Sequence, residues 1–254
     1  MKIQNISKYF SFKFYLKFMV LSIPVLLITG PFLPDLFLTL SSFSFLIFMI
    51  LKKKLIYLHH RFFILFIVFY VILVTSSIFS DYQSKSIITS LAYLRFGIFI
   101  FVINFLINEE EQFLKNLANL LLLIFLVLLF DSIFQKITGY NILGTSRPYG
   151  RVTSLFGDDI KLGSYIARFT PLFIALLLCL KSNKYLIIAI FLISIFLTIL
   201  SGERTPALIV FLFLFCFLIF SNLSKKLKIG LLIIPFLFLA VSILNEEIRY
   251  RFFQ

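Results

Sequence analysis

The residues of this chain whose type and placement suggest chemistry are its arginines. A guanidinium binds phosphate or carboxylate oxygens through two parallel hydrogen bonds, and it keeps its charge in a dry environment. Arg147 and Arg151 flank a Pro-Tyr-Gly turn, and Arg204 follows Ser-Gly-Glu in a second short polar segment. The first pair could converge on one ligand. These positions predict a site that binds an anion.

The elements that position these arginines must be helices in lipid, because the chain is too apolar to fold in water. Of its 254 residues, 61% are hydrophobic and 14% are charged, and its mean hydropathy is +1.07. A soluble domain has about a quarter of its residues charged. Apolar runs near the roughly 20 residues that a helix needs to cross a bilayer lie at 14–30, 36–51, 62–80, 87–107, 117–135, 163–180, 185–201, 206–221 and 229–244. We expect an all-α polytopic transmembrane bundle of about nine spans, forming one transmembrane domain over residues 1–254.

Lysines predict the orientation of these spans. With the N-terminus in the cytoplasm, 13 of the 16 lysines fall on the cytoplasmic side, as the positive-inside rule requires. Arginines do the opposite. Only Arg61 is cytoplasmic, Arg95 lies inside the fourth span, and the others fall on or near the outer side: Arg147, Arg151, Arg168, Arg204, Arg249 and Arg251. Any one of them could snorkel to headgroups or balance an acid, but six together favour an anion-binding surface on the outer face.

The longest outer loop covers residues 136–162 and is rich in Gly, Thr, Ser and Asn. Its Asp158 and Asp159 just precede the sixth span, where a carboxylate favours a helix N-terminus, so we expect one of them to cap that helix. Arg168 lies in the first turns of the span and could meet Asp158 or a ligand.

The second outer turn runs from Leu200 to Pro206 and contains Glu203 and Arg204. Pro206 suits the first turn of the eighth helix, and Ser201 or Thr205 could cap it. The Glu-Arg pair is either a local salt bridge or part of a ligand site, and we favour the ligand site.

Two further charges, Arg95 and Asp131, lie inside spans. Intramembrane charges usually face a bundle interior and pair. One interpretation is therefore a structural Arg95–Asp131 bridge, and the other is that both line a cavity that opens outward.

Several classes of site are absent from the sequence. The positive charges lie between apolar spans rather than on one polar face, which argues against nucleic acid as a partner. The cysteines, Cys179 and Cys216, lie in apolar runs, and no GxxxxGK[ST] loop, Cys/His cluster or HExxH motif occurs. We therefore expect no metal and no cofactor. The pair His59–His60 is interpreted as an interfacial flank, and Glu109–Glu111 as a solvated cytoplasmic turn.

The outer segments, taken with the spans, resemble the O-antigen ligase and O-antigen polymerase superfamily of bacterial membrane glycosyltransferases. In that family an Arg-x-x-(small)-x-Phe segment leads into a Gly-containing helix start and a proline, and a Ser-Gly-x-Arg-(small) turn follows before the next span. Here the corresponding segments are Arg151-Val-Thr-Ser-Leu-Phe, then Gly163 and Pro171, and Ser201-Gly-Glu-Arg204-Thr. The resemblance covers roughly residues 60–254.

The resemblance implies a glycosyltransferase at the outer face of the bacterial inner membrane, in lipopolysaccharide or surface-polysaccharide biosynthesis. Such an enzyme transfers oligo- or polysaccharide from undecaprenyl pyrophosphate to lipid A–core or to another glycan, with no metal or nucleotide. By resemblance, Arg151 and Arg204 bind the pyrophosphate, followed by Arg147, Arg168 and Arg95. Supporting residues are Glu203, Asp158, Asp159 and Asp131.

One departure from the family concerns the C-terminal part. In the family a large outer loop carrying a functional histidine comes next, followed by further spans, whereas this chain stops at Gln254. No catalytic residue is assigned, and we expect a truncated member, which leaves open whether the chain is active by itself. The alternatives are a flippase or other transporter of lipid-linked sugar, and a non-catalytic partner in a polysaccharide assembly complex.

Overall fold

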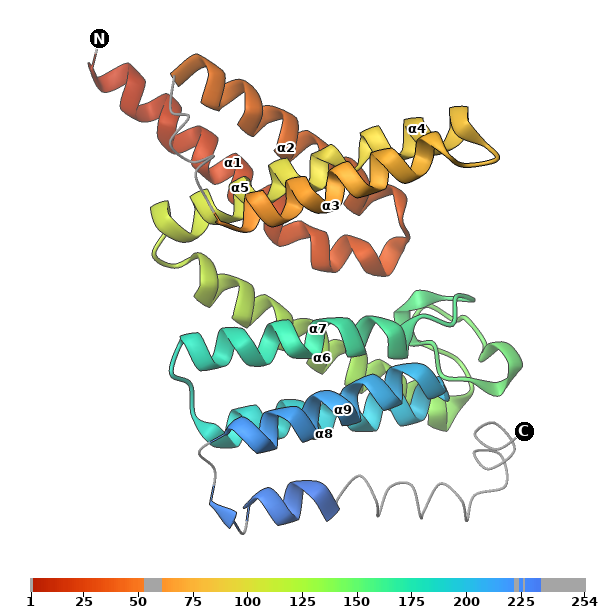
Figure 1. Cartoon of the computed structure of the whole chain (residues 1–254). Coiled ribbons are helices and arrows are strands. Elements are labelled where there is room, and N and C mark those ends of the chain that lie inside the picture. The colour runs from red at the N-terminus through yellow and green to blue at the C-terminus, as the bar shows by residue number, and fades with distance from the viewer. Residues whose placement is uncertain (1, 53–60, 222–223, 226, 234–254) are drawn as a thin grey trace. The chain divides into compact units, whose positions relative to one another are not determined.

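The computed structural model describes residues 2–52, 61–221, 224–225 and 227–233, except for the side chains of 2–11, 61–62 and 149. These residues are predominantly α-helical (Figure 1). The order is α1 (Lys2–Thr29), α2 (Phe32–Lys52), α3 (Arg61–Ile78), α4 (Gln83–Ala92), α5 (Leu94–Glu109), α6 (Phe113–Thr138), α7 (Leu162–Cys179), α8 (Lys184–Ser201) and α9 (Arg204–Phe220), with the short 3-10 turns η2 (Pro148–Gly150) and η3 (Ser154–Phe156) before α7. In the described part of the chain, β pairing is limited to one isolated bridge between Tyr140 and Ser146.

Six helical segments are long and apolar enough to cross a membrane. They are 12–29, 32–52, 83–109, 113–138, 162–179 and 184–201. Two shorter apolar helices, 63–78 and 204–220, accompany them. The expectation of an all-helical, multi-pass membrane protein is therefore confirmed. A count of nine spans stays a prediction, and most of its ninth run, 229–244, lies outside the described residues.

The helix α2 shows why these elements suit lipid. Five of its exposed positions follow a helical spacing along one face and are apolar: Leu36, Leu40, Phe43, Ile47 and Ile50. Its buried positions include the hydroxyl residues Ser41 and Ser42 beside Phe45 and Phe48. Exposed apolar groups and inward hydroxyls are stable in hydrocarbon, because lipid solvates the first group and helix contacts satisfy the second.

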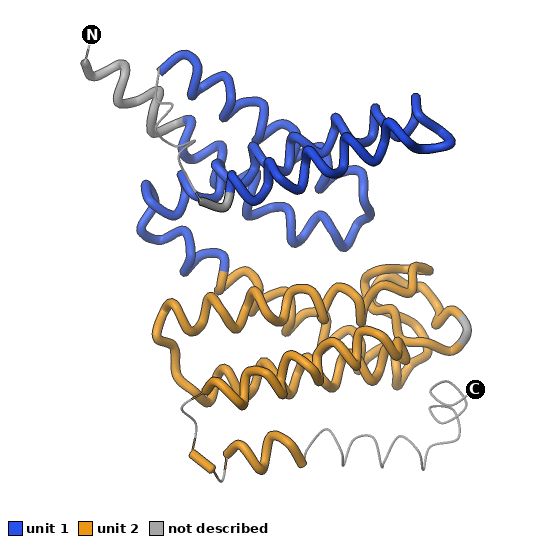
Figure 2. Tube along the Cα trace, in the orientation of Figure 1, with its two compact units in different colours: residues 1–117 blue, residues 118–254 orange. Residues whose placement is uncertain are grey.

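The chain divides into two compact units, residues 1–117 and 118–254, coloured separately in Figure 2. In the first unit, α1, α2 and α5 pack around a core that includes Leu16, Phe45, Phe101 and Phe105. In the second unit, α7, α8 and α9 pack against one another. Their contact surface buries Phe173, Ile190, Phe191 and Leu214.

The ends of the helices differ from the sequence expectation in two places. The N-cap of α7 is Lys161 rather than Asp158 or Asp159, and it makes no side-chain cap. The N-cap of α9 is Glu203, so neither Ser201 nor Thr205 caps that helix. Both predictions were wrong. At α7, a contact between helices, made by Glu203, replaces the local cap, whereas at α9 the N-cap residue makes no side-chain cap.

Candidate functional site

A pocket in unit 2 lies where α7 and α9 begin and α8 ends. Its volume is about 420 Å³, and its lining consists of Arg151, Ser164, Gly202, Glu203, Arg204, Thr205 and Pro206. Figure 1 shows the connection between α6 and α7 at this same end of the helices. The pocket therefore brings together three segments: that connection, the first turn of α7, and the α8–α9 turn. Two of its side chains are the predicted guanidiniums Arg151 and Arg204.

Glu203 fixes the wall of this pocket by bonding to the start of α7. Its Oε1 accepts a hydrogen bond of 2.7 Å from the backbone N–H of Gly163, and its Oε2 accepts one of 2.7 Å from Ser164 Oγ. The first N–H groups of a helix have no partner within the helix and carry partial positive charge. A carboxylate from 40 positions along the chain satisfies them here. Since both of its oxygens are engaged with α7, Glu203 acts first as a clamp between helices.

The clamp requires glycine at position 163. A Cβ at this position would lie 2.5 Å from Ser201 Oγ and 2.8 Å from Glu203 Oε1. Both distances are far below ordinary van der Waals contact, so a Cβ would force the Ser201 hydroxyl and the Glu203 carboxylate to move and would disturb the bonds from Glu203 to α7. The glycine of the first sequence motif thus allows the close approach of the second motif.

The α8–α9 turn brings Glu203 and Arg204 to the pocket within a minimal length of chain. Gly202 adopts the left-handed conformation with φ +68°, which ends α8 and reverses the backbone. The helix α9 then starts at Arg204, with Pro206 in its first turn, where the missing proline N–H is least costly. Arg204 and Thr205 are both exposed. The positive end of α9 and the Arg204 guanidinium therefore border the same space, an arrangement suited to an anion.

Arg151 reaches the pocket from a connection that two side chains of α6 hold in place. Gln135 Oε1 accepts hydrogen bonds from the backbone N–H groups of Thr153, at 2.9 Å, and Ser154, at 2.8 Å. Asp131, one helical turn earlier, accepts 2.6 Å from Ser154 Oγ and 2.8 Å from the N–H of Ile142. Asp131, Gln135, Thr153 and Ser154 have 0% exposed surface. This buried polar network determines the path of the connection next to Arg151.

Ser154 is the most constrained residue of the connection. Its φ of +53° is unfavourable for a residue with a side chain. Its N–H, its hydroxyl and its carbonyl are each bonded, to Gln135, Asp131 and Asn141 respectively. Three bonds to one buried residue hold the strained conformation in place.

The remaining predicted residues of unit 2 do not line the pocket. Arg147 is the half-buried N-cap of η2, and Arg168 is exposed on α7. Asp158 and Asp159 are exposed, and Asp159 pairs with Lys161 at 2.5 Å. The sequence therefore pointed to the two arginines that line the pocket. It also assigned to the same site nearby charged residues that do not line the pocket.

Arg95 belongs to unit 1. Its Nη2 pairs with Asp35 Oδ1 at 2.6 Å, and its Nη1 donates to Thr39 Oγ1 at 3.1 Å. Asp35 lies in the first turn of α2. In unit 2, Asp131 is bonded to Ser154 and Ile142. Each charge therefore has partners within its own unit that the sequence did not predict, and an Arg95–Asp131 bridge stays a prediction.

Sequence reasoning missed the loop anchors Gln135, Asn141, Thr153 and Ser154. The available signal was the spacing of Asp131 and Gln135, which are four residues apart and share one face of an otherwise apolar helix. Such a polar pair in a span needs polar partners, and the Thr-Ser segment of the connection provides them.

Other predicted positions carry no structural result. Arg249, Arg251, His59 and His60 lie outside the described residues. Among the residues that are described, no group of three or more His, Cys, Asp or Glu side chains is placed to hold a metal ion.

No protein-family model, no curated protein and no solved structure matches this chain. The chemistry of the pocket therefore has to be argued from its own geometry. Two guanidinium-bearing segments and a helix N-terminus surround an open space of about 420 Å³, which suits a compact multivalent anion such as a diphosphate.

Proposed function

We propose that this chain is an O-antigen ligase-like membrane glycosyltransferase that binds undecaprenyl-pyrophosphate-linked oligo- or polysaccharide through Arg151 and Arg204. The observation that supports this proposal is that one pocket is lined by both arginines, although 53 positions separate them in the chain. Their motifs are also the two on which the family resemblance depends.

The pocket would act on the leaving group of the transfer. In such a reaction the bond between the sugar C1 and the pyrophosphate oxygen breaks, and the hydroxyl oxygen of lipid A–core or another glycan bonds to C1 as its own O–H bond breaks and its proton passes to water. The pyrophosphate leaves with the electron pair, so negative charge grows on its oxygens. Guanidinium groups and helix N–H groups already in place stabilise that charge without reorganising. The apolar surfaces of the helices would lie against the undecaprenyl chain.

The proposed topology has about nine spans, a cytoplasmic N-terminus and the pocket at the outer face of a bacterial inner membrane. Ion pairs within unit 1 support the alternation of the first spans. Glu110, in the α5–α6 turn, pairs with Lys13 at 3.1 Å and Lys17 at 2.8 Å, both near the start of the apolar segment 12–29 of α1. Residues in direct contact lie at one membrane face, so the number of crossings between them is even. Counting α1, α2, α3 and the α4–α5 segment as one crossing each gives four, as the topology requires.

The test is binding of undecaprenyl diphosphate to the full chain in phosphatidylcholine nanodiscs, measured by native mass spectrometry. A hydrogen bond to a charged group contributes about 1.5–3 kcal/mol. We expect Arg151→Ala and Arg204→Ala each to weaken binding by about ten- to a hundredfold. Undecaprenyl monophosphate should bind the wild type more weakly than the diphosphate.

The matched control is Lys161→Ala, which removes a cation from the start of α7 that does not line the pocket. Its affinity for the diphosphate should equal that of the wild type. Equal losses of affinity in all three variants would show that removing any positive charge weakens binding. That result would refute the assignment of this pocket as the diphosphate site. A chain that moves a labelled lipid-linked glycan across a bilayer without transferring it would be a flippase instead.

A further inference from the structure

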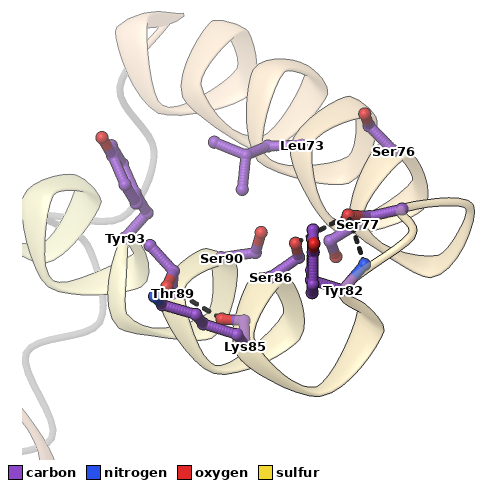
Figure 3. Close-up of a pocket in the computed structure, with 10 residues that line it drawn as sticks. Leu73, Ser76, Ser77, Tyr82, Lys85, Ser86, Thr89, Ser90 and Tyr93 are labelled. Atoms are coloured by element: carbon purple, nitrogen blue, oxygen red, sulfur yellow. Dashed lines mark hydrogen bonds between the residues drawn. The ribbon is translucent and has the colours of Figure 1, made fainter.

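A second pocket, in unit 1, is chemically different from the arginine pocket. It lies between the C-terminal part of α3 and α4, and its volume is about 630 Å³, within the roughly 300–1,000 Å³ range of small-molecule sites. Its lining is rich in hydroxyl groups: Ser76, Ser77, Ser80, Tyr82, Ser86, Thr89, Ser90 and Tyr93, with Leu73 and Lys85. We call this space the hydroxyl groove (Figure 3).

The spacing of its serines would ordinarily bring two helices into close contact. Ser76 and Ser80 on the α3 side, and Ser86 and Ser90 on α4, are small residues four positions apart. In membranes such pairs allow helices to approach closely and to bond across the contact. Ser80, in the turn that follows α3, bonds to Ser86, with their oxygens 2.9 Å apart. The hydroxyls of Ser77 and Thr89 donate to backbone carbonyls of their own helices. Beyond these bonds the helices enclose a pocket.

Ser90 supplies the observation that points to a ligand. Only 5% of its surface is exposed, and it lines the groove. In Figure 3 its side chain projects from α4 toward Leu73 of α3. Among the described residues its hydroxyl has no hydrogen-bond partner, and its oxygen is not one of the fully enclosed polar atoms, so it is open to the groove. A hydroxyl-bearing ligand in the groove would bond to it.

The composition of the groove selects the class of ligand. Ser, Thr and Tyr hydroxyls both donate and accept hydrogen bonds, as sugar hydroxyls do. Tyr82 and Tyr93 are 78% and 40% exposed, and their rings offer the combination of an apolar face and a polar tip. Lys85 is the one cationic residue in the lining, which is too little charge for a diphosphate. We propose that the hydroxyl groove binds a saccharide.

This proposal does not rest on the proposed transferase function, since it uses none of the residues of the arginine pocket. The two are compatible.

The test is saturation-transfer difference NMR with the methyl glycosides of glucose, galactose, mannose and N-acetylglucosamine. The full chain should be held in phosphatidylcholine nanodiscs, because the headgroup of an alkyl maltoside detergent would compete. We expect binding of at least one glycoside. Removing one hydrogen-bonding hydroxyl in Ser90→Ala should weaken that binding by about five- to tenfold. The larger side chain of Ser90→Leu should abolish it.

The control is Thr75→Ala, which removes an exposed hydroxyl of α3 that does not line the groove; it should bind like the wild type. Arg151→Ala should also bind the glycoside normally, so failure of this proposal and failure of diphosphate binding are distinguishable. Circular dichroism checks that each variant keeps its helix content, and Ser90→Ala, the smaller change, decides the case if Ser90→Leu does not fold. The proposal is overturned if no glycoside binds the wild type, or if Ser90→Ala, in a folded state, binds as tightly as the wild type.

An additional arm identifies the source of the sugar. Nanodiscs containing a monoglucosyl diacylglycerol would compete with the free glycoside if the groove takes a lipid headgroup from its own bilayer. Absence of competition, with the free glycoside still bound, would assign the groove to a glycan that arrives from the aqueous side.

Discussion

Glu203 illustrates at the level of a single residue how a charged side chain that lines a pocket also serves the fold. Here its two oxygens accept bonds of 2.7 Å from the N–H of Gly163 and the hydroxyl of Ser164. Its charge faces the positive end of α7. The sequence interpretation of Glu203 as part of a ligand site is therefore refined, because its first contacts are with the fold.

A substitution at Gly163 tests this clamp. Because a Cβ would lie 2.5 Å from Ser201 Oγ and 2.8 Å from Glu203 Oε1, Gly163→Ala should displace both side chains and disturb the bonds from Glu203 to α7. Overpacking of this kind costs about 1–3 kcal/mol. We expect a lower unfolding temperature by circular dichroism, and weaker diphosphate binding although neither pocket arginine is altered.

The control for this substitution is Gly230→Ala, at a helical glycine where an added Cβ would meet nothing within 4 Å. Alanine is favoured over glycine in helices by up to about 1 kcal/mol, so this variant should be as stable as the wild type or slightly more stable. Wild-type stability in Gly163→Ala would show that the clamp is not needed.

At the level of elements, the connection between α6 and α7 is held by side chains of α6 rather than by regular structure of its own. The side-chain oxygen of Gln135 accepts hydrogen bonds from the backbone N–H groups of Thr153 and Ser154. Gln135→Leu would leave both N–H groups buried without that acceptor, at about 1–3 kcal/mol for each. The connection should then be cut by an added protease much faster than in the wild type, while the helix content stays the same.

The matched substitution is Gln112→Leu, at an exposed position in the α5–α6 turn. It adds the same apolar side chain without removing a buried acceptor, so its cleavage pattern should equal that of the wild type. Equal protection of residues 139–161 in both variants would contradict the anchoring role of Gln135.

The same elements show how far sequence reasoning reached. Hydropathy located the helical segments, because a lipid-spanning helix must be apolar along its length. The two motifs identified Arg151 and Arg204, which line one pocket. Capping rules based on neighbouring residues failed at the starts of α7 and α9. The groups that bond the α7 terminus come from Glu203, which follows α7 and α8 in the chain. Long-range partners of this kind leave no periodic signal in a sequence.

At the scale of the whole molecule, contacts between distant segments restrict the topology. The Lys13 and Lys17 side chains of α1 bond to Glu110, and Lys13 also donates to the carbonyl of Glu109. The sequence interpretation of residues 109–111 as a solvated turn is thus corrected for Glu110, whose carboxylate is 24% exposed. The correction supports the proposed alternation of spans, because it joins the first turns of the apolar segment 12–29 of α1 to the turn after α5.

These ion pairs also predict how stability depends on pH. Hydrogen bonding to Lys17 is the largest cause that holds the pKa of Glu110 below its ordinary value of 4.5, with further lowering from Lys13 and opposition from partial burial. A carboxyl group with a lowered pKa in the folded state stabilises the fold fully above its unfolded pKa. This contribution is lost as the pH falls through the lowered value. Glu110→Gln should therefore unfold at a temperature about 1–4 °C below the wild type at pH 7, and the difference should shrink toward zero as the pH drops below 4.5.

Thermal unfolding followed by circular dichroism between pH 7 and pH 3 measures this difference, and comparing variants at each pH cancels the titration of every other carboxyl group. The control is Glu111→Gln, one residue along the same turn, whose side chain is exposed and has no ion pair with any described residue. Its unfolding temperature should follow that of the wild type at every pH. A Glu110→Gln difference that stays constant from pH 7 to pH 3 would mean that the carboxylate charge does not join α1 to the α5–α6 turn, and the even count of crossings between them would lose its support.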